Sequence, residues 1–369
     1  MNSRAAIVTT LRDAGATLDS FIGYHLAVGF ERLYLFFDDP ADPSVEVARR
    51  YPQVTAVVGD EALRSRWKET RLYAKNRRMR RYAEREVMAR QALNAGLAIE
   101  MALRERIEWL LHIDSDELFY SPAASVGEHF AGLTARGVRH VTYPNYEAVP
   151  ESAEIGDYFR EVTLFKKSPW QLPPEKGPGA DADAPHHFFY YYEGKSAARL
   201  CEGLIPRGVH EFWLPDHQRV GFRLRLLLRR SRVGQLLGRH TGPGRAQARP
   251  PRQGHDGPVR GPVILHYPCC GFEHFYRKYL TLGPFPDKWF GKYDISRRVP
   301  FHLEARDAVQ RGDETAARSF YERRRGISDR GQVERLISEG LLCRITQPSE
   351  VLAGMPHRAV LPGRLAERA

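Results

Sequence analysis

Short apolar runs alternate with amphipathic stretches through the N-terminal part of the chain. Three of these runs have the length and composition of strands, at residues 5–10, 32–37 and 53–58. Between the first two, Leu18, Phe21 and Ile22 recur at the spacing of a helix with one apolar face. Strands that alternate with helices indicate a parallel sheet covered by helices. The pattern predicts an α/β fold with a mostly parallel central sheet and helices on both faces.

A further apolar run, residues 109–113, ends abruptly in an acidic segment. Asp114, Asp116 and Glu117 lie within four residues, and such carboxylates repel each other unless a cation neutralises them. Alternation along an extended chain places Asp114 and Asp116 on the same side. Two oxygen ligands so placed suit Mn²⁺ or Mg²⁺ carrying a diphosphate. An acidic turn after a core strand is the alternative interpretation.

Acids also follow the second and third predicted strands. Asp38 and Asp39 come directly after the second strand, and Asp60 follows the third. In open sheets of this kind, ligands bind outside the carboxyl ends of the strands. We therefore expect these acids and the Asp114/Asp116 pair to border one crevice. Any single one of them would serve equally well as a turn former or a helix cap.

Further charged candidates lie later in the chain. Residues 61–106 have a helical pattern, in which Arg90 is either a phosphate or base contact or a surface arginine. Lys195, Arg199 and His210 form a second polar cluster. The other expected elements are strands at 138–143 and 162–165, loops at 144–151 and 171–185, a short strand ending at His266, and helices at 272–279 and 303–321.

Composition bounds the function classes. The chain has 369 residues, enough to bury a large core, and a net charge of +11, which suits a polyanionic partner. Its four cysteines lack the spacing of a zinc site or a disulfide framework, which favours a reduced compartment. We find no signal peptide and no apolar run of membrane-spanning length. These features predict a cytoplasmic protein or one associated only peripherally with a membrane.

Several segments occur in a distinctive order: LDSFIGYHLAVGFERLYLFFDD, RQALNAG, WLLHIDSDELF, GKSAAR with GVH, and LHY with a later F..K. Each is weak alone, but in this order and spacing they resemble glycosyltransferases of the family 2-like and family 92 type. The resemblance spans roughly residues 5–280. It implies the GT-A fold, a nucleotide-diphosphosugar-binding α/β/α sandwich.

The resemblance also implies how the nucleotide is held. The first strand and its loop would contact the base, which implicates Thr9 and Arg12. Asp38 or Asp39 would meet the uracil or the ribose. Both loops depart from the family pattern, because Arg12 and Asp13 stand where an Asn-Glu pair is common and prolines follow Asp39.

For the diphosphate, the resemblance implies that Asp114 and Asp116 bind the metal ion. A late histidine completes the metal shell in such enzymes, and His266 is the first candidate, with His210 second. A bound divalent ion stabilises the leaving nucleoside diphosphate as a Lewis acid. Lys195, Arg199 or Arg90 would add fixed positive charge.

An inverting transfer also needs a carboxylate that takes the proton of the acceptor hydroxyl. Glu147, expected on the loop after the strand at 138–143, is the preferred candidate, and Glu193 is the alternative. Either of them would also be explained as an exposed loop acid.

The predicted protein is a metal-dependent glycosyltransferase that uses a nucleotide sugar, with a UDP-sugar and inversion expected. The acceptor would be a glycan, a lipid or a protein. One rival is a nucleotidyltransferase, disfavoured because the first loop has only Gly15 where a glycine-rich basic loop is needed. Another is a basic protein that binds RNA or a membrane surface without catalysis.

The predicted organisation follows composition. A catalytic domain covers residues 1–225, with a nucleotide-binding half at 1–120 and an acceptor half at 121–225. A basic segment at 226–260, rich in Arg, Gly and Pro, is expected to be a disordered insertion. It suits peripheral membrane contact, and we expect no specific nucleic acid. Residues 261–345 complete the catalytic domain, and 346–369 form a tail.

Overall fold

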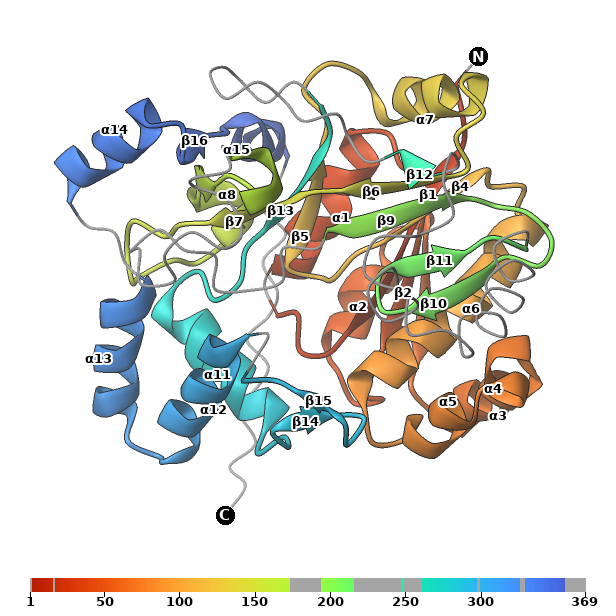
Figure 1. Cartoon of the computed structure of the whole chain (residues 1–369), viewed down its shortest axis with the longest axis horizontal. Helices are drawn as coiled ribbons and strands as arrows, with labels where there is room; N and C mark the ends of the chain where they lie inside the picture. The colour runs from red at the N-terminus through yellow and green to blue at the C-terminus, as the bar shows by residue number, and fades with distance from the viewer. Residues whose placement is uncertain are drawn as a thin grey trace, which may run out of the picture.

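The computed structural model describes residues 2–15, 17–172, 194–215, 247–248, 261–296, 299–325 and 329–355. Its strands gather into a seven-stranded central sheet and a five-stranded second sheet beside it (Figure 1). Most of the predicted loop at 171–185, Glu193, and nearly all of the predicted insertion lie outside the described residues.

The central sheet has the strand order β12-β6-β9-β4-β1-β2-β3. Neighbours are parallel except where β9 pairs with β4 and β6. The strands are β1 (Ala5–Leu11), β2 (Arg32–Phe37), β3 (Val54–Val58), β4 (Trp109–His112), β6 (His140–Tyr143), β9 (Lys195–Arg199) and β12 (Gln247–Ala248). The predicted α/β fold with a mostly parallel sheet, which the GT-A resemblance implies, is confirmed.

Helices cover both faces of this sheet because successive strand side chains point to opposite sides. Ile7 of β1 belongs to one core and Val8, the next residue, belongs to the other. The first core includes side chains of α1 (Thr17–Ala27), α2 (Ser44–Arg49) and α7 (Val126–Ala135). The second includes side chains of α3 (Glu61–Glu69), α4 (Arg71–Lys75), α5 (Arg77–Tyr82) and α6 (Val87–Arg104).

The second sheet has the strand order β16-β8-β7-β13-β5. Its strands are β5 (Glu117–Tyr120), β7 (Asn145–Ala148), β8 (Leu164–Lys166), β13 (Val263–His266) and β16 (Leu342–Arg344). Because β4 belongs to the central sheet and β5 to the second, residues 113–116 join the two sheets. Asp116 lies in a turn here, so the extended chain expected through the acidic segment is not observed.

The loop predicted at 144–151 is wrong, because this segment contains β7. Pro144 and Pro150 both lie outside the strand, so neither removes a ladder hydrogen bond. The carbonyl of Pro144 accepts a hydrogen bond from Ile264 N at 2.9 Å. Glu147 is therefore a strand residue.

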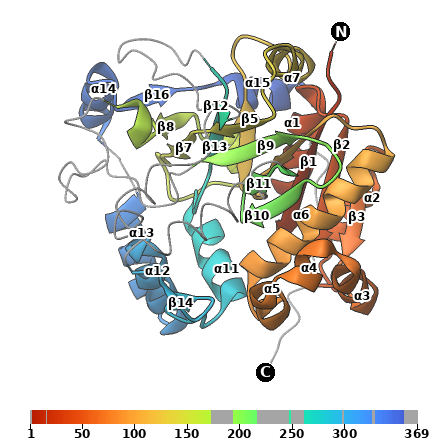
Figure 2. The ribbon, with the colours of Figure 1, turned by 45° about the vertical axis from the view of Figure 1, so that its right-hand side comes forward.

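Three C-terminal helices build a separate small core, which Figure 2 shows below the second sheet: α11 (Phe272–Leu282), α12 (Pro300–Gln310) and α13 (Glu314–Arg325). The single helix predicted over 303–321 is wrong. Gly312 interrupts it with a φ of 76°, and the side chain of Asp313 then accepts a hydrogen bond from Ala316 N at 3.0 Å.

The predicted tail begins instead with a helix, α15 (Gln347–Ala353). Tyr24 Oη donates a hydrogen bond to Gln347 Oε1 at 3.0 Å, and Leu352 is fully buried. Arg160 Nη1 donates to the carbonyl of Leu352 at 2.7 Å. Pro348 argued against a helix, but proline is tolerated in the first turn.

The remaining elements are short. They are α8 (Tyr158–Glu161), the 3₁₀ turn η1 (Pro169–Gln171), the hairpin β10 (Ile205–Gly208) and β11 (Glu211–Trp213), the hairpin β14 (Lys288–Trp289) and β15 (Tyr293–Asp294), and α14 (Arg330–Ser338). Within the described ranges, none of the helices is both long and apolar enough to cross a bilayer.

Candidate functional site

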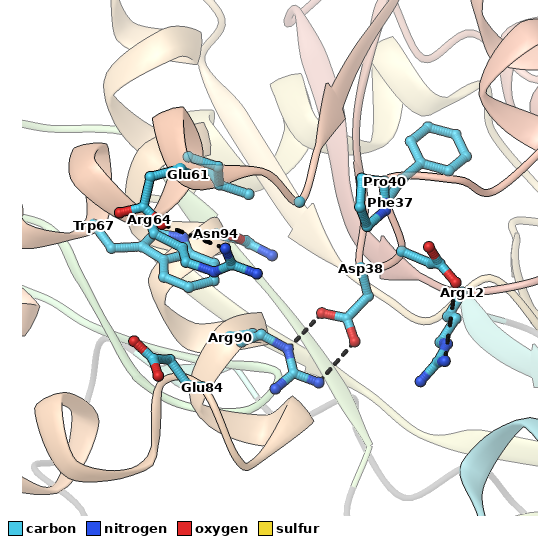
Figure 3. A pocket seen from close by; sticks show the side chains of 13 residues that line it. Arg12, Phe37, Asp38, Pro40, Glu61, Arg64, Trp67, Glu84, Arg90 and Asn94 are labelled. Carbon is cyan, nitrogen blue, oxygen red and sulfur yellow. Dashed lines mark hydrogen bonds and ion pairs between the residues drawn. The ribbon is translucent and has the colours of Figure 1, made fainter.

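A cavity of about 610 Å³ opens beyond the carboxyl ends of β1, β2 and β3 (Figure 3). Its lining mixes charged groups with two aromatic residues, Phe37 and Trp67. Arg90 of α6 lies opposite Asp38 and donates two hydrogen bonds to its carboxylate, one of them from Nη2 to Oδ2 at 2.7 Å. The cavity therefore occupies the place at which parallel sheets bind ligands.

The predicted nucleotide residues divide between this cavity and the core. Arg12, Asp38 and Asp39 line the cavity, and Arg12 Nη2 lies 3.9 Å from Asp39 Oδ2. Thr9 does not line it and has no exposed surface. Thr10, the next residue, points instead toward α6, where its Oγ1 accepts a hydrogen bond from Asn94 at 2.9 Å. The alternation of side chains along β1 explains why only one of the two threonines can face α6.

Helix α6 connects the cavity with the acidic turn. Arg90 binds Asp38, and the next residue, Gln91, donates a hydrogen bond from Nε2 to Asp114 Oδ1 at 2.8 Å. One turn further, Asn94 Oδ1 accepts a hydrogen bond from Trp67 Nε1 at 2.8 Å. Positions three and four apart on a helix share a face. One face of α6 therefore lines the cavity and also contacts the acidic turn.

Asp114 is held by a buried lysine. Lys195 Nζ, at the start of β9, lies 2.5 Å from Asp114 Oδ2 and 3.1 Å from Glu117 Oε2. His210 Nε2 lies 3.1 Å from the same Asp114 oxygen. Burial alone would raise the pKa of Asp114, but His210 and Lys195 outweigh it and hold that pKa well below its usual range. The predicted polar cluster of Lys195 and His210 thus packs against the acidic turn.

Asp116 binds a different cation. Lys278 Nζ, from α11, lies 2.8 Å from Asp116 Oδ2, and His266 Nε2 lies 3.8 Å from the same oxygen. Burial would raise the pKa of Asp116, but Lys278 and His266 together lower it. Burial lowers the pKa of His266 to about 4, so its ring is neutral near pH 7 and suited to donate a lone pair.

A row of buried ionisable residues crosses the second sheet beside this pair. Lys166, Glu147, His266 and Glu117 are aligned on the neighbouring strands β8, β7, β13 and β5. Residues aligned in this way project from the same face. Lys166 Nζ lies 3.5 Å from Glu147 Oε1, and the side chain of Glu147 is 0% exposed. Glu147 therefore lies within the row, not on an exposed loop as predicted.

Glu117 ends the row under the acidic turn. Its Oε1 accepts a hydrogen bond from Asn145 Nδ2 at 3.0 Å, and its Oε2 accepts one from the backbone N–H of Asp114 at 2.9 Å. Burial raises the pKa of Glu117, and the Lys195 ammonium acts against that rise. Oε2 of Glu117 thus fixes the backbone of the turn that carries Asp114 and Asp116, and Asn145 of β7 holds the other oxygen.

The distances between the possible ligand atoms can be compared with those around a bound divalent ion. Ligands of an octahedral ion with bonds of about 2.1 Å lie about 3 Å apart when adjacent and about 4 Å when opposite. The 3.8 Å between Asp116 Oδ2 and His266 Nε2 is compatible with a shared ion. Asp114 already carries Lys195 and Gln91 on its two oxygens, which suits a positioning role. In the described part of the chain, no group of three or more potential ligands gathers, so substrate phosphate and water would have to complete the shell.

Five contributors to the cavity and the acidic turn were not identified from sequence as site residues: Trp67, Gln91, Asn94, Glu117 and Lys278. Gln91 and Lys278 lie in segments that carry the family resemblance, RQALNAG and F..K, which is the signal that could have found them. Arg199 has no described contact with the acidic turn. It pairs in register with Trp109, at the opposite end of β4 from Asp114.

Several solved structures align with part of the fold. Staphylococcus aureus TarS aligns with 53% of this chain and 28% of its own, at 8% identity and a TM-score of 0.26. A 4-diphosphocytidyl-2C-methyl-D-erythritol synthase from Anaerococcus prevotii aligns with 53% of this chain and 71% of its own, at 13% identity and a TM-score of 0.25. Likeness at this level adds nothing to the fold assignment, which rests on the strand order and pairing.

No family model matches the sequence. Among curated proteins, the chain is 34% identical over 222 residues to "Glycosyltransferase-like At2g41451" of Arabidopsis thaliana, covering 56% of this chain and 48% of that protein. It is 32% identical over 222 residues to "Glycosyltransferase-like At3g57200" of the same plant, covering 56% and 42%. The chain thus spans about half the length of these relatives. Over more than half of its own length, it is similar in sequence to proteins named glycosyltransferase-like.

Proposed function

We propose that this protein is a glycosyltransferase that transfers a sugar from a nucleotide-diphosphate sugar to an acceptor. The observation that carries the proposal is the face of α6 that joins two sites. Arg90 binds Asp38 in the cavity, and Gln91 binds Asp114 in the acidic turn. A ligand with a nucleoside at one end and a diphosphate at the other would fit across this face. The sequence similarity to glycosyltransferase-like proteins supports the same assignment.

The cavity is proposed to receive the nucleoside. Trp67 offers an aromatic ring in its wall, and Asn94 fixes that ring through the indole N–H. Asp38 and Asp39 offer carboxylate oxygens to ribose hydroxyls, and Arg12 and Arg90 balance their charge. A UDP-sugar is the proposed donor, as the family resemblance suggests.

The acidic turn is proposed to receive the diphosphate with Mn²⁺ or Mg²⁺. Asp116 and His266 would hold the ion, which when bound supplies Lewis-acid stabilisation of the leaving group. Lys195 holds Asp114 in place, and Glu117 holds the backbone of the turn. These buried contacts preorganise the turn, so that no reorganisation is needed when charge develops.

Inverting transfer is proposed as well. A general base must come within hydrogen-bond reach of the acceptor hydroxyl. Glu147 has no exposed side-chain surface here and faces Lys166, so its role in this conformation is within the buried row. The anomeric configuration of the product, read by NMR, tests inversion directly. A glycan, lipid or protein remains the proposed class of acceptor.

The proposal is tested with a panel of UDP-, GDP- and CDP-sugars, each with and without Mn²⁺. The readouts are the thermal midpoint and release of the nucleoside diphosphate. One donor should stabilise the wild-type protein, and Asp116→Asn should abolish that response. Asp307→Asn, at an exposed acid of α12, is the matched control. If no donor stabilises the wild type, or Asp116→Asn responds as the wild type does, the proposal fails.

A further inference from the structure

Two lysines reach the acidic turn, and their surroundings differ. The side chain of Lys195 is 3% exposed and contacts two acids, Asp114 and Glu117. The side chain of Lys278 is 33% exposed, and that of its ion-pair partner Asp116 is 20% exposed. An ammonium enclosed by two buried carboxylates is fixed, whereas one at the end of a partly exposed four-carbon stem can change partner.

The helix that carries Lys278 is itself anchored at both ends. Near its start, His274 Nε2 lies 2.9 Å from the carbonyl oxygen of Gly156. At its last turn, Thr281 Oγ1 donates a hydrogen bond to Asp13 Oδ2 at 3.3 Å, in the loop after β1. A change of partner by Lys278 therefore requires only its side chain to move, and α11 keeps that side chain beside the acidic turn.

Lys278 stands where it competes with a divalent ion. Its Nζ and His266 Nε2 both approach Oδ2 of Asp116, at 2.8 Å and 3.8 Å. An ion held by that oxygen lies about 2.1 Å from it, and two cations so close to each other repel strongly. With an ion bound there, the ammonium of Lys278 would be repelled from Asp116. The diphosphate that arrives with the ion is the nearest anion able to receive it.

We infer that Lys278 exchanges partners during donor binding, from Asp116 before the ion binds to the donor diphosphate afterwards. This inference rests on the proposed function. It gives Lys278 two opposite effects. Without nucleotide, it neutralises Asp116 and weakens metal binding. With nucleotide, it strengthens the complex. Metal and nucleoside diphosphate are consequently coupled, each raising the affinity for the other by the same factor.

The test compares wild-type protein with Lys278→Met in two binding measurements. Free Mn²⁺, followed by its EPR signal, should bind Lys278→Met about 10-fold more tightly than wild type when nucleotide is absent. UDP at saturating Mn²⁺, followed by calorimetry, should bind that variant about 10-fold more weakly. Lys278→Arg, which keeps the charge, should show the wild-type affinity in both measurements. Lys288→Met, at an exposed lysine of β14, should change neither.

Opposite changes in the two affinities are the distinguishing result, because a merely disrupted site would lose both. Lys278→Gln can still hydrogen-bond Asp116, and it replaces the methionine variant with the same expectations if that variant does not fold. Unchanged Mn²⁺ affinity, or unchanged UDP affinity, in the charge-free variants overturns the inference. If wild-type protein binds none of UDP, GDP or CDP with Mn²⁺, the proposed function fails. This result differs from the one that overturns the Lys278 inference alone, in which wild-type protein still binds UDP.

Discussion

Arg90 and Asp38, which are 52 positions apart in the sequence, face each other through two hydrogen bonds at the edge of the cavity. Arg90 comes from the second turn of α6 and Asp38 from the residue after β2. Their side chains are 18% and 10% exposed, so the pair is largely removed from water. A planar guanidinium matches a carboxylate in this two-point arrangement, which a lysine cannot reproduce.

Replacement of Arg90 by lysine should therefore weaken nucleotide binding without loss of charge. We expect the affinity for UDP at saturating Mn²⁺ to fall about 10-fold, which corresponds to about 1.4 kcal/mol, the range of one charged hydrogen bond. Isothermal titration calorimetry measures it. Arg324→Lys, in an exposed pair with Glu304, serves as the control and should leave affinity unchanged. Equal affinities for wild type and Arg90→Lys would remove Arg90 from the nucleotide site.

Trp67 should report directly on occupation of the cavity. Its indole lines the wall and is held by Asn94, so a nucleobase in the cavity would change the emission of that ring. We expect UDP to quench part of the tryptophan fluorescence, and Trp67→Phe to lose that quenching. Trp289→Phe, in the β14–β15 hairpin, should keep it. Quenching that persists in Trp67→Phe would place the nucleoside elsewhere.

Gly59 is required for space at the floor of the cavity. A Cβ on this residue would lie 2.7 Å from the carbonyl oxygen of Phe37 and 2.9 Å from that of Asp38. Gly59→Ala should thus push the β2 end away and destabilise the fold by about 1–3 kcal/mol. Gly208→Ala, where nothing lies within 4 Å, is the matched control. Urea denaturation compares the two, and similar midpoints would contradict the expectation.

Lys195 should matter for stability as well as for the site. Its removal leaves the carboxylates of Asp114 and Glu117 without their shared ammonium, and Glu117 has no exposed side-chain surface. Breaking a buried ion pair from one side costs about 3–5 kcal/mol. Lys195→Met should show a loss of this size in chemical denaturation. Lys68→Met, whose side chain is 58% exposed, should show almost none. A small loss in Lys195→Met would mean that the acids are already protonated or hydrated.

His25 should contribute to acid sensitivity. The backbone N–H of Phe119 donates to its Nε2 at 3.2 Å, so Nδ1 carries the proton that is donated to the carbonyl of Phe21 at 2.8 Å. The ring is therefore neutral, and burial lowers its pKa from 6.5 to about 3. As the pH falls between those values, the unfolded chain takes up the proton first, and stability is lost.

The matched change is His25→Gln, which offers the same acceptor and donor without titrating. Between pH 6 and pH 4, the wild-type free energy of unfolding should fall more steeply than that of the variant, by about 1.4 kcal/mol per pH unit at most. Urea titrations at intervals across that range give both slopes. Parallel slopes would mean that His25 does not titrate between the two states.

The sequence predicted the site residues best where they directly follow a strand. Asp38, Asp39 and Asp114 follow strands whose carboxyl ends meet at one edge, so periodicity and acid placement were enough to gather them. Thr9, which was expected to contact the base, does not line the cavity, because a run of buried apolar neighbours does not reveal which face each residue takes.

Contacts between distant segments were beyond prediction. Gln91 reaches Asp114 across 23 positions, and Lys278 reaches Asp116 across 162. The family resemblance marks both segments, but nothing in their local hydrophobic pattern encodes which residue each one contacts. Short elements bounded by proline were also missed, since β7 and α15 are each paired or packed by residues far away in the chain.

Helix α15 bears on how a shortened form of this protein should be designed. Gln347 and Leu352 meet α1 and α8 from the far end of the chain, through Tyr24 and Arg160. A truncation at residue 345 would uncover those surfaces of α1 and α8, which pack within the catalytic half of the fold. Fragments made for crystallisation or assays should accordingly extend through residue 355.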